Sequence, residues 1–182
     1  MQRAALGFLM IYAAVGLAVS LYVHVTSFFA EPPGGQTLFT MLHVGIFPLW
    51  IPVIFLFNTM SGRPGFSRGR MSSGEFWSLF GRAPAILRWM TLGFFGYAFV
   101  NFLLFVATTA RTPRPKAGAD PSFSVWHGFS GHWMLFYCAG LTIATIAFFQ
   151  GTEPSSRRCP EGHFVGPDDS FCPRCGRAVG KL

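Results

Sequence analysis

The sequence predicts an all-α integral membrane protein with four transmembrane helices and a small polar module at its C-terminal end. Three observations support this prediction. Of the 182 residues, 51% are hydrophobic and only 12% are charged, about half the charged fraction of a typical soluble domain. The chain contains 22 phenylalanines, and its charges gather in short stretches between long apolar ones. A soluble protein of this composition would lack the polar surface needed to cover its core.

Four apolar windows are long enough to cross a bilayer, which takes about 20 residues at a rise of about 1.5 Å each. None contains Asp or Glu, and Arg88 lies near the start of the third, where its side chain can reach the interface. The fourth window is the shortest, and Trp126 and Phe129 can extend it. We expect residues 1–151 to form a transmembrane four-helix bundle and residues 152–182 to form a separate tail. The windows are approximately residues 4–29, 37–60, 85–110 and 132–150.

The basic residues between these windows predict the orientation of the chain. Of the 14 Lys and Arg residues, only Arg111, Arg114 and Lys116 follow the third window, and the other 11 fall on the side that holds both termini. Because basic loops stay in the cytoplasm, we expect both termini to be cytoplasmic. Residues 61–84, which lie on the same side, fit either a short amphipathic helix on the membrane surface or a solvated loop.

The tail holds three of the four cysteines within the segment CPEGHFVGPDDSFCPRCG, residues 159–176. A Cys-x2-Cys pair in a tight turn presents two thiolates to one ion, and Gly162 and Gly176 suit such turns because glycine adopts a positive φ readily. In a reducing cytoplasm, clustered thiols are more often metal ligands than disulfides. The alternative is that the thiols are free and a fourth ligand is missing. A set of three cysteines and one histidine favours zinc in a closed structural site, with the ligands Cys159, His163, Cys172 and Cys175.

The residues CPEGH and FCPRCG resemble the zinc-ribbon family, and specifically the minimal ribbons appended to many bacterial proteins. The resemblance covers residues 159–176, about one tenth of the chain. The chain differs at His163, where the commonest pattern has a second Cys-x2-Cys pair. The resemblance implies a small module that folds around a structural zinc and binds protein or nucleic acid. It also leads us to expect that this protein lies in the cytoplasmic membrane of a bacterium.

The charge of the tail favours a protein partner over a nucleic acid. Residues 152–182 contain five Lys or Arg and four Asp or Glu. Three zinc-bound thiolates would cancel the remaining positive charge, so the tail is poorly suited to a phosphate backbone. We therefore expect a cytoplasmic protein partner and no nucleic acid.

Four histidines lie toward the outer ends of the predicted helices: His24, His43, His127 and His132. His24 and His43 fall at similar depth on consecutive antiparallel helices, so their imidazoles could meet and hold a haem iron or a transition metal. His127 and His132 are about 140° apart around a helix, so at most one of them would join the pair. The alternative is that these histidines have structural roles. Histidines also form hydrogen bonds between helices and lie in the aromatic belts at membrane interfaces.

Two functions follow from these features. The first is a polytopic membrane scaffold, assembly factor or regulator whose tail binds a cytoplasmic protein. The second is a membrane redox or metal-handling protein with His24 and His43 as ligands near the outer face. The sequence has no His-Glu-x-x-His motif, no P-loop and no Gly-x-Ser-x-Gly motif, so we do not expect an enzyme. Pairs of small residues such as Gly93 and Gly96 fit either a homo- or hetero-oligomer or packing within one chain.

Overall fold

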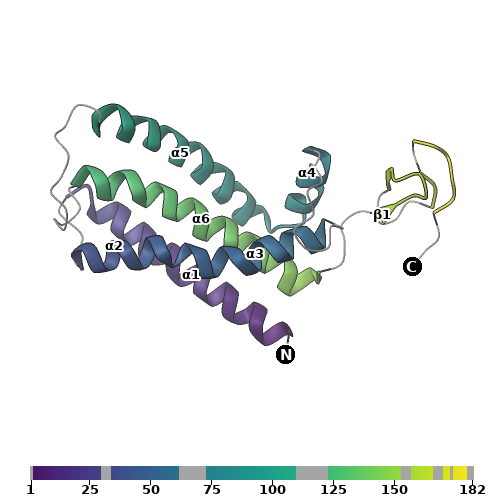
Figure 1. Cartoon of the computed structure of the whole chain (residues 1–182), viewed down its shortest axis with the longest axis horizontal. Helices are drawn as coiled ribbons and strands as arrows, with labels where there is room; N and C mark the ends of the chain where they lie inside the picture. The colour runs from purple at the N-terminus through teal and green to yellow at the C-terminus, as the bar shows by residue number, and fades with distance from the viewer. Residues whose placement is uncertain are drawn as a thin grey trace.

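The computed structural model contains four rods that are each long and apolar enough to cross a membrane: α1, α2 together with α3, α5 and α6 (Figure 1). This confirms the predicted number and apolar character of the long helices. The described residues are 2–29, 34–61, 73–109, 123–152, 157–165, 170–172 and 174–179. Their elements, in chain order, are α1 (Gln2–Thr26), α2 (Gly35–Val44), α3 (Ile46–Met60), α4 (Ser73–Gly81), α5 (Ala85–Thr109), α6 (Phe123–Gln150), β1 (Arg157–Arg158) and β2 (Phe164–Val165).

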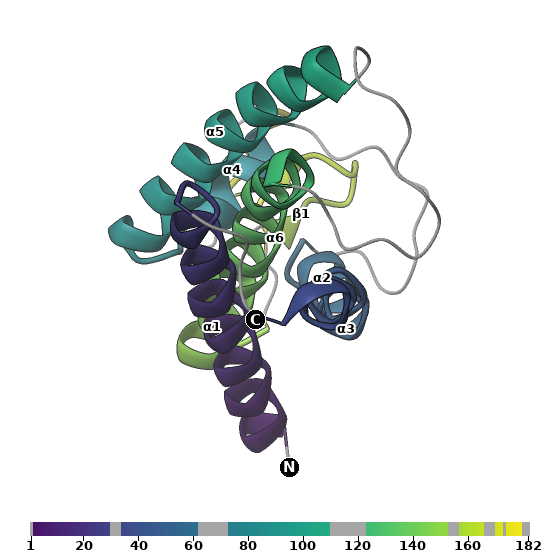
Figure 2. The ribbon, with the colours of Figure 1, turned by 90° about the vertical axis from the view of Figure 1, so that its left-hand side faces the viewer.

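Helix α6 is the centre of the bundle. It packs against α1, α5 and α3, whereas α1 and α3 meet only slightly, and the end-on view places it between them (Figure 2). In its apolar stretch 61% of the residues are buried, compared with 11% in α5. The helix also begins earlier than its predicted window, at Phe123, so Trp126 and Phe129 are part of it. The sequence predicts that the first two rods lie side by side, but α1 packs mainly against α6 and meets α3 only slightly.

Glycines explain how α6 approaches three neighbours so closely. A Cβ on Gly16 of α1 would lie 2.2 Å from the ring of Tyr137 on α6. On α6 itself, Gly128 receives the ring of Phe105 from α5, and Gly140 receives Leu49 from α3. At each contact a large side chain on one helix occupies the space that a Cβ would take on the other, which is how apolar helices pack tightly without water.

The second rod is interrupted at Gly45, between α2 and α3. Pro48 contributes to this break because it has no amide hydrogen and its ring crowds the carbonyl four residues before it. Two tyrosine hydroxyls donate to carbonyls at the break. Tyr12 of α1 bonds the oxygen of Gly45 at 2.8 Å, and Tyr137 of α6 bonds that of Leu42 at 3.1 Å. The break is therefore also a polar contact that joins three rods.

Helix α4 confirms the helical alternative for part of residues 61–84. It lies at the end of the bundle that holds the first residues of α1 and the last of α6 (Figure 1), and it buries Leu79 and Phe80. Arg82, which follows it, donates to the side-chain oxygen of Gln150 at 3.0 Å and reaches the carbonyls of Gln150 and Gly151 at 3.5 Å. A basic group is favourable there because the last carbonyls of a helix carry a partial negative charge.

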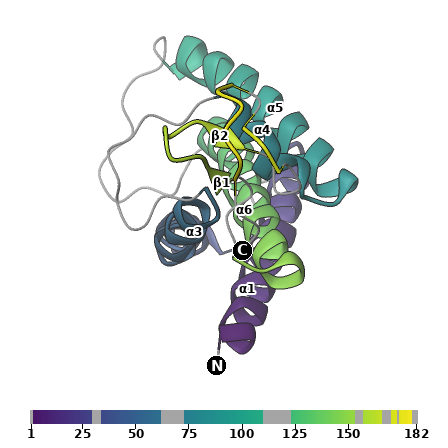
Figure 3. The same ribbon diagram turned by 90° about the vertical axis from the view of Figure 1, so that its right-hand side faces the viewer.

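The tail is a small unit with a core of its own. Strands β1 and β2 pair antiparallel, with Arg157 opposite Val165, and Figure 3 shows them from the tail end of the molecule. The buried residues of the tail are Cys159, Val165 and Cys172, with Val179 packed against them. This is too little apolar surface to hold a fold by itself, and modules of this size usually depend on a metal or on disulfides.

The substitution Gly16→Ala tests the close contact between α1 and α6. Tyr137 cannot swing aside cheaply, because its hydroxyl is bonded to Leu42. We expect Gly16→Ala to destabilise the bundle by about 1–3 kcal/mol, as overpacking does. Thermal unfolding of the purified protein in detergent measures this change.

Gly93→Ala is the matched control on α5. Among the described residues, nothing lies within 4 Å of a Cβ built on Gly93. Because alanine favours a helix over glycine by about 1 kcal/mol, this variant should be as stable as the wild type or slightly more so. Equal effects of the two substitutions would contradict the packing described here.

Candidate metal centre

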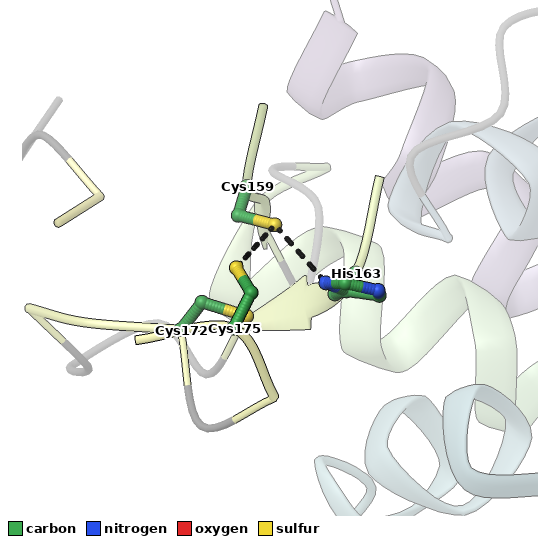
Figure 4. Close-up of side chains that lie close together, drawn as sticks. All are labelled: Cys159, His163, Cys172 and Cys175. Atoms are coloured by element: carbon green, nitrogen blue, oxygen red, sulfur yellow. Dashed lines mark hydrogen bonds between the residues drawn. The ribbon is translucent and has the colours of Figure 1, made fainter. Parts of the chain in front are cut away.

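Four side chains of the tail converge on one point (Figure 4). The Sγ atom of Cys159 lies 3.6 Å from Nδ1 of His163 and 3.7 Å from Sγ of Cys175. Together with Sγ of Cys172, these ligand atoms all lie within 4.8 Å of one another. Zn–S bonds of about 2.3 Å and Zn–N bonds of about 2.0 Å separate tetrahedral ligands by roughly 3.5–3.8 Å, whereas disulfide sulfurs are about 2.05 Å apart. The two measured separations match those of ligands around one metal ion such as zinc, and they are too long for a disulfide.

Each half of the site is a turn closed by main-chain hydrogen bonds. In the first turn, the amide of Cys159 donates to the oxygen of His163 at 2.9 Å, and that of Gly162 donates to the oxygen of Cys159 at 2.8 Å. In the second, the amide of Cys172 donates to Arg177, and that of Gly176 donates to Cys172, both at 2.8 Å. The two glycines have φ values of 78° and 71°, which only glycine adopts without strain. Both turns thus have the bend expected from their glycines.

The difference between the turns explains why a histidine completes the set. When Cys159 is aligned with Cys172, and the two glycines with each other, the first turn is one residue shorter and has no counterpart of Cys175. His163 follows its glycine as Arg177 does in the second turn. The imidazole of His163 extends back to the Cys159 sulfur and takes the place of the missing thiolate. The sequence signal for a histidine ligand is a turn that is one residue shorter than its counterpart and has a histidine directly after its glycine.

The second turn favours the thiolate form of Cys172. Burial raises the pKa of this thiol, but hydrogen bonds from the backbone amides of Arg174 and Cys175, together with the neighbouring thiols, lower it to about 6. The thiolate is the form that binds a metal. At neutral pH, Cys172 is therefore mostly in the thiolate form that binds a metal ion.

The ligand set is closed. All four donors come from the tail itself, so a tetrahedral ion would have no open position for water or substrate. Arg177 and Glu161 form an ion pair of 2.9 Å between the two turns, but both side chains are exposed and such pairs contribute little to stability. The arrangement suits a structural metal rather than a catalytic one.

His24 lies in a hydrogen-bonded network between α1, α5 and α6. Its Nδ1 is 2.7 Å from Oγ of Ser130, and its Nε2 is 2.8 Å from the hydroxyl of Tyr97. The Ser130 hydroxyl donates its hydrogen to the carbonyl of His127, so it must accept from Nδ1 of His24. The other nitrogen then accepts from Tyr97. Both nitrogens of His24 are engaged in hydrogen bonds.

The structure brings His24 together with His127 rather than with His43. The two rings are 4.8 Å apart, and Nδ1 of His127 lies 3.2 Å from Oγ of Ser27. Asn101 of α5 donates to the carbonyl of His127 at 2.8 Å. The hydroxyls of Ser27, Tyr97 and Ser130 were not predicted as members of this network, because nothing in their spacing shows that they lie at one depth.

His43 of α2 and His132 of α6 make contacts outside the His24 network. Trp133 donates through Nε1 to Nδ1 of His43 at 3.4 Å, and the exposed His132 packs its ring 4.5 Å from that of Phe136. In the part of the chain that the structure describes, no hydrogen bond or ring contact joins His24 to His43. The four histidines therefore form two separate groups.

Metal analysis of the full-length protein tests the tail site. We expect about one zinc per chain, because structural zinc sites take four Cys or His ligands and the tail brings four together. The ion should be lost in Cys159→Ser, Cys172→Ser and Cys175→Ser. Cys138→Ser is the matched control, because Cys138 is buried in α6. Zinc retained after any two of the three tail substitutions would contradict this site.

Removal of one hydroxyl tests the His24 network. We expect Tyr97→Phe to destabilise the bundle by about 0.5–1.5 kcal/mol, because Nε2 of His24 loses its donor. Tyr22→Phe on the exposed face of α1 is the control and should have no measurable effect. Thermal unfolding in detergent measures the stability of both variants. Equal stabilities of Tyr97→Phe and Tyr22→Phe would argue against the hydrogen bond between Tyr97 and His24.

Comparison with known proteins adds no family to these observations. No protein-family model matches the chain, and no curated protein or solved structure is significantly similar to it. The likeness of the tail to a zinc ribbon therefore rests on its own ligands and turns. The function must be inferred from the geometry.

Proposed function

We propose that this protein is a membrane-embedded scaffold, assembly factor or regulator that binds a cytoplasmic protein through its zinc-loaded tail. The observation that carries this proposal is the closed group of Cys159, His163, Cys172 and Cys175. A closed site stabilises a fold and leaves no coordination position for a reaction. A module folded in this way serves as a binding surface.

The helical part supports insertion into a membrane. Large apolar side chains are exposed along all four rods, and α5 is the most exposed of them, with Phe95, Phe99 and Leu103 on its surface. Such surfaces are unfavourable in water and favourable against lipid chains. The excess of basic residues on the side of the termini supports a cytoplasmic location for the tail.

The surface of the tail suits a protein partner. Phe171 is 63% exposed and lies opposite Ala178 in a backbone bridge. An exposed aromatic side chain on a small rigid module is typical of the residues that contribute most to protein interfaces. Arg177 is paired with Glu161, so this part of the surface carries both charges rather than the uniform positive charge that nucleic acids attract.

The alternative function, a haem or metal site with His24 and His43 as ligands, has less support. A metal ion would have to replace the hydrogen bond of His24 to Ser130 or to Tyr97. His43 accepts from Trp133 through one nitrogen, which leaves the hydrogen on the other in the neutral ring. In this arrangement the two histidines stabilise contacts between helices.

An absorption spectrum combined with metal analysis distinguishes the two functions. We expect the detergent-purified wild type to be colourless with about one zinc per chain, because in the described part of the chain the tail alone offers four clustered Cys and His ligands. The variant with His24→Ala and His43→Ala should retain that zinc. A haem band or a second metal that disappears in this variant would instead establish the alternative.

Crosslinking in cells tests the binding role of the tail. A photoreactive amino acid at position 171 should form one defined adduct with a cytoplasmic protein when the zinc ligands are intact. The adduct should be lost in Cys172→Ser, because the tail no longer folds, and should persist in Cys138→Ser. Adducts that are the same with and without the zinc ligands would contradict a role for the folded tail.

A further inference from the structure

The three sulfur ligands of the tail differ in their exposure. Cys159 and Cys172 are buried, with 4% and 1% of their surface exposed, whereas Cys175 is exposed. Peroxides oxidise thiolates that they can reach, and buried thiolates react much more slowly. Cys175 is therefore the cysteine of this group that lies open to solvent, and so to an oxidant dissolved in it.

A second sulfur lies within reach of Cys175. The Sγ atom of Cys159 is 3.7 Å away, and it belongs to the other turn of the site (Figure 4). A disulfide needs a separation of about 2.05 Å, so the two sulfurs must approach by about 1.7 Å. A sulfenic acid on Cys175 would meet the Cys159 thiol before any group from another molecule.

We propose that Cys175 is an oxidation site and that its reaction with a peroxide releases the metal from the tail. The inference rests on the zinc site proposed above. The Cys175 thiolate attacks one oxygen of hydrogen peroxide, the O–O bond breaks, and the hydroxide that leaves takes a proton to become water. The product is a sulfenic acid. The Cys159 sulfur then attacks the Cys175 sulfur, the S–O bond breaks, and a second water leaves with another proton.

The two steps oxidise two thiolates to one disulfide and reduce one peroxide to two waters. The metal keeps only Cys172 and His163, and two ligands do not hold zinc in a structural site. Because the apolar core of the tail is so small, loss of the ion unfolds the module. Binding of a protein partner by the folded tail would then depend on the redox state of Cys175.

The test treats the zinc-loaded full-length protein in detergent with hydrogen peroxide. We expect release of about one zinc per chain, a mass lower by about 2 Da after denaturation, and a peptide map in which Cys159 is joined to Cys175. A thiol reductant followed by zinc should restore the metal. A peptide map with Cys172 joined to Cys175 would overturn the assignment of Cys159 as the second sulfur.

Histidine variants separate the roles of the three cysteines, because Cys2His2 sets also bind zinc. Cys175→His should retain zinc during peroxide treatment, whereas Cys172→His should still lose it. Cys159→His should form no disulfide between positions 159 and 175. Equal release from Cys175→His and the wild type would overturn the proposal. A wild type that is zinc-loaded and unaffected by peroxide would overturn this inference alone, and a wild type without zinc would overturn the zinc site as well.

Discussion

Polar groups inside an apolar bundle have no water to bond, so they bond to other groups of the protein, and in the described part of the chain α6 supplies partners to each of the other three rods. Ser130 of α6 bonds His24 of α1, and the carbonyl of His127 on α6 accepts a hydrogen bond from Asn101 of α5. Tyr137 bonds the break between α2 and α3, and Thr142 bonds Thr91 of α5 at 2.9 Å. The same helix contacts its neighbours at glycine positions. Polar pairing and close packing thus select one arrangement of four otherwise similar rods.

The tail uses a different source of stability. Its apolar core is confined to a few residues, so a metal ion held by the ligand group would contribute most of the free energy of folding. The main-chain bonds of the two turns aim Cys159 and Cys172 at a common point. Because the first turn lacks one residue, an imidazole replaces a thiolate and reaches the same point from one position further along the chain. The number of ligands is preserved although the two turns are unequal.

The bundle and the tail therefore suit complementary roles. The bundle carries large exposed apolar side chains, and its His24 and His43 make contacts between helices. Arg82 binds the last turn of α6, just before the segment that leads to the tail. The tail carries an exposed aromatic side chain, Phe171, and a candidate metal site in which the residue Cys175 is exposed. Together they fit a protein that stays in the membrane and binds a soluble partner.

Much of this could be predicted from the sequence by itself. The number of long helices follows from the number and length of the apolar windows. Whether a segment can cross a membrane depends on its own apolar composition and length, and not on which other helix it packs against. The four candidate metal ligands follow from their spacing, because the two turns that hold them are local structures. Both features involve residues that are close together along the chain.

Only the tertiary structure decided which distant residues meet. The sequence placed His24 and His43 at similar depth, but depth along a rod does not determine the direction that a side chain takes around it. That direction depends on the packing of all the helices against α6, so His24 faces Tyr97 and Ser130 from other helices and His43 faces Trp133. The exposure of Cys175, in contrast to Cys159 and Cys172, also depends on how the two turns close over each other. Spacing identifies ligands, whereas the folded chain determines which of them solvent can reach.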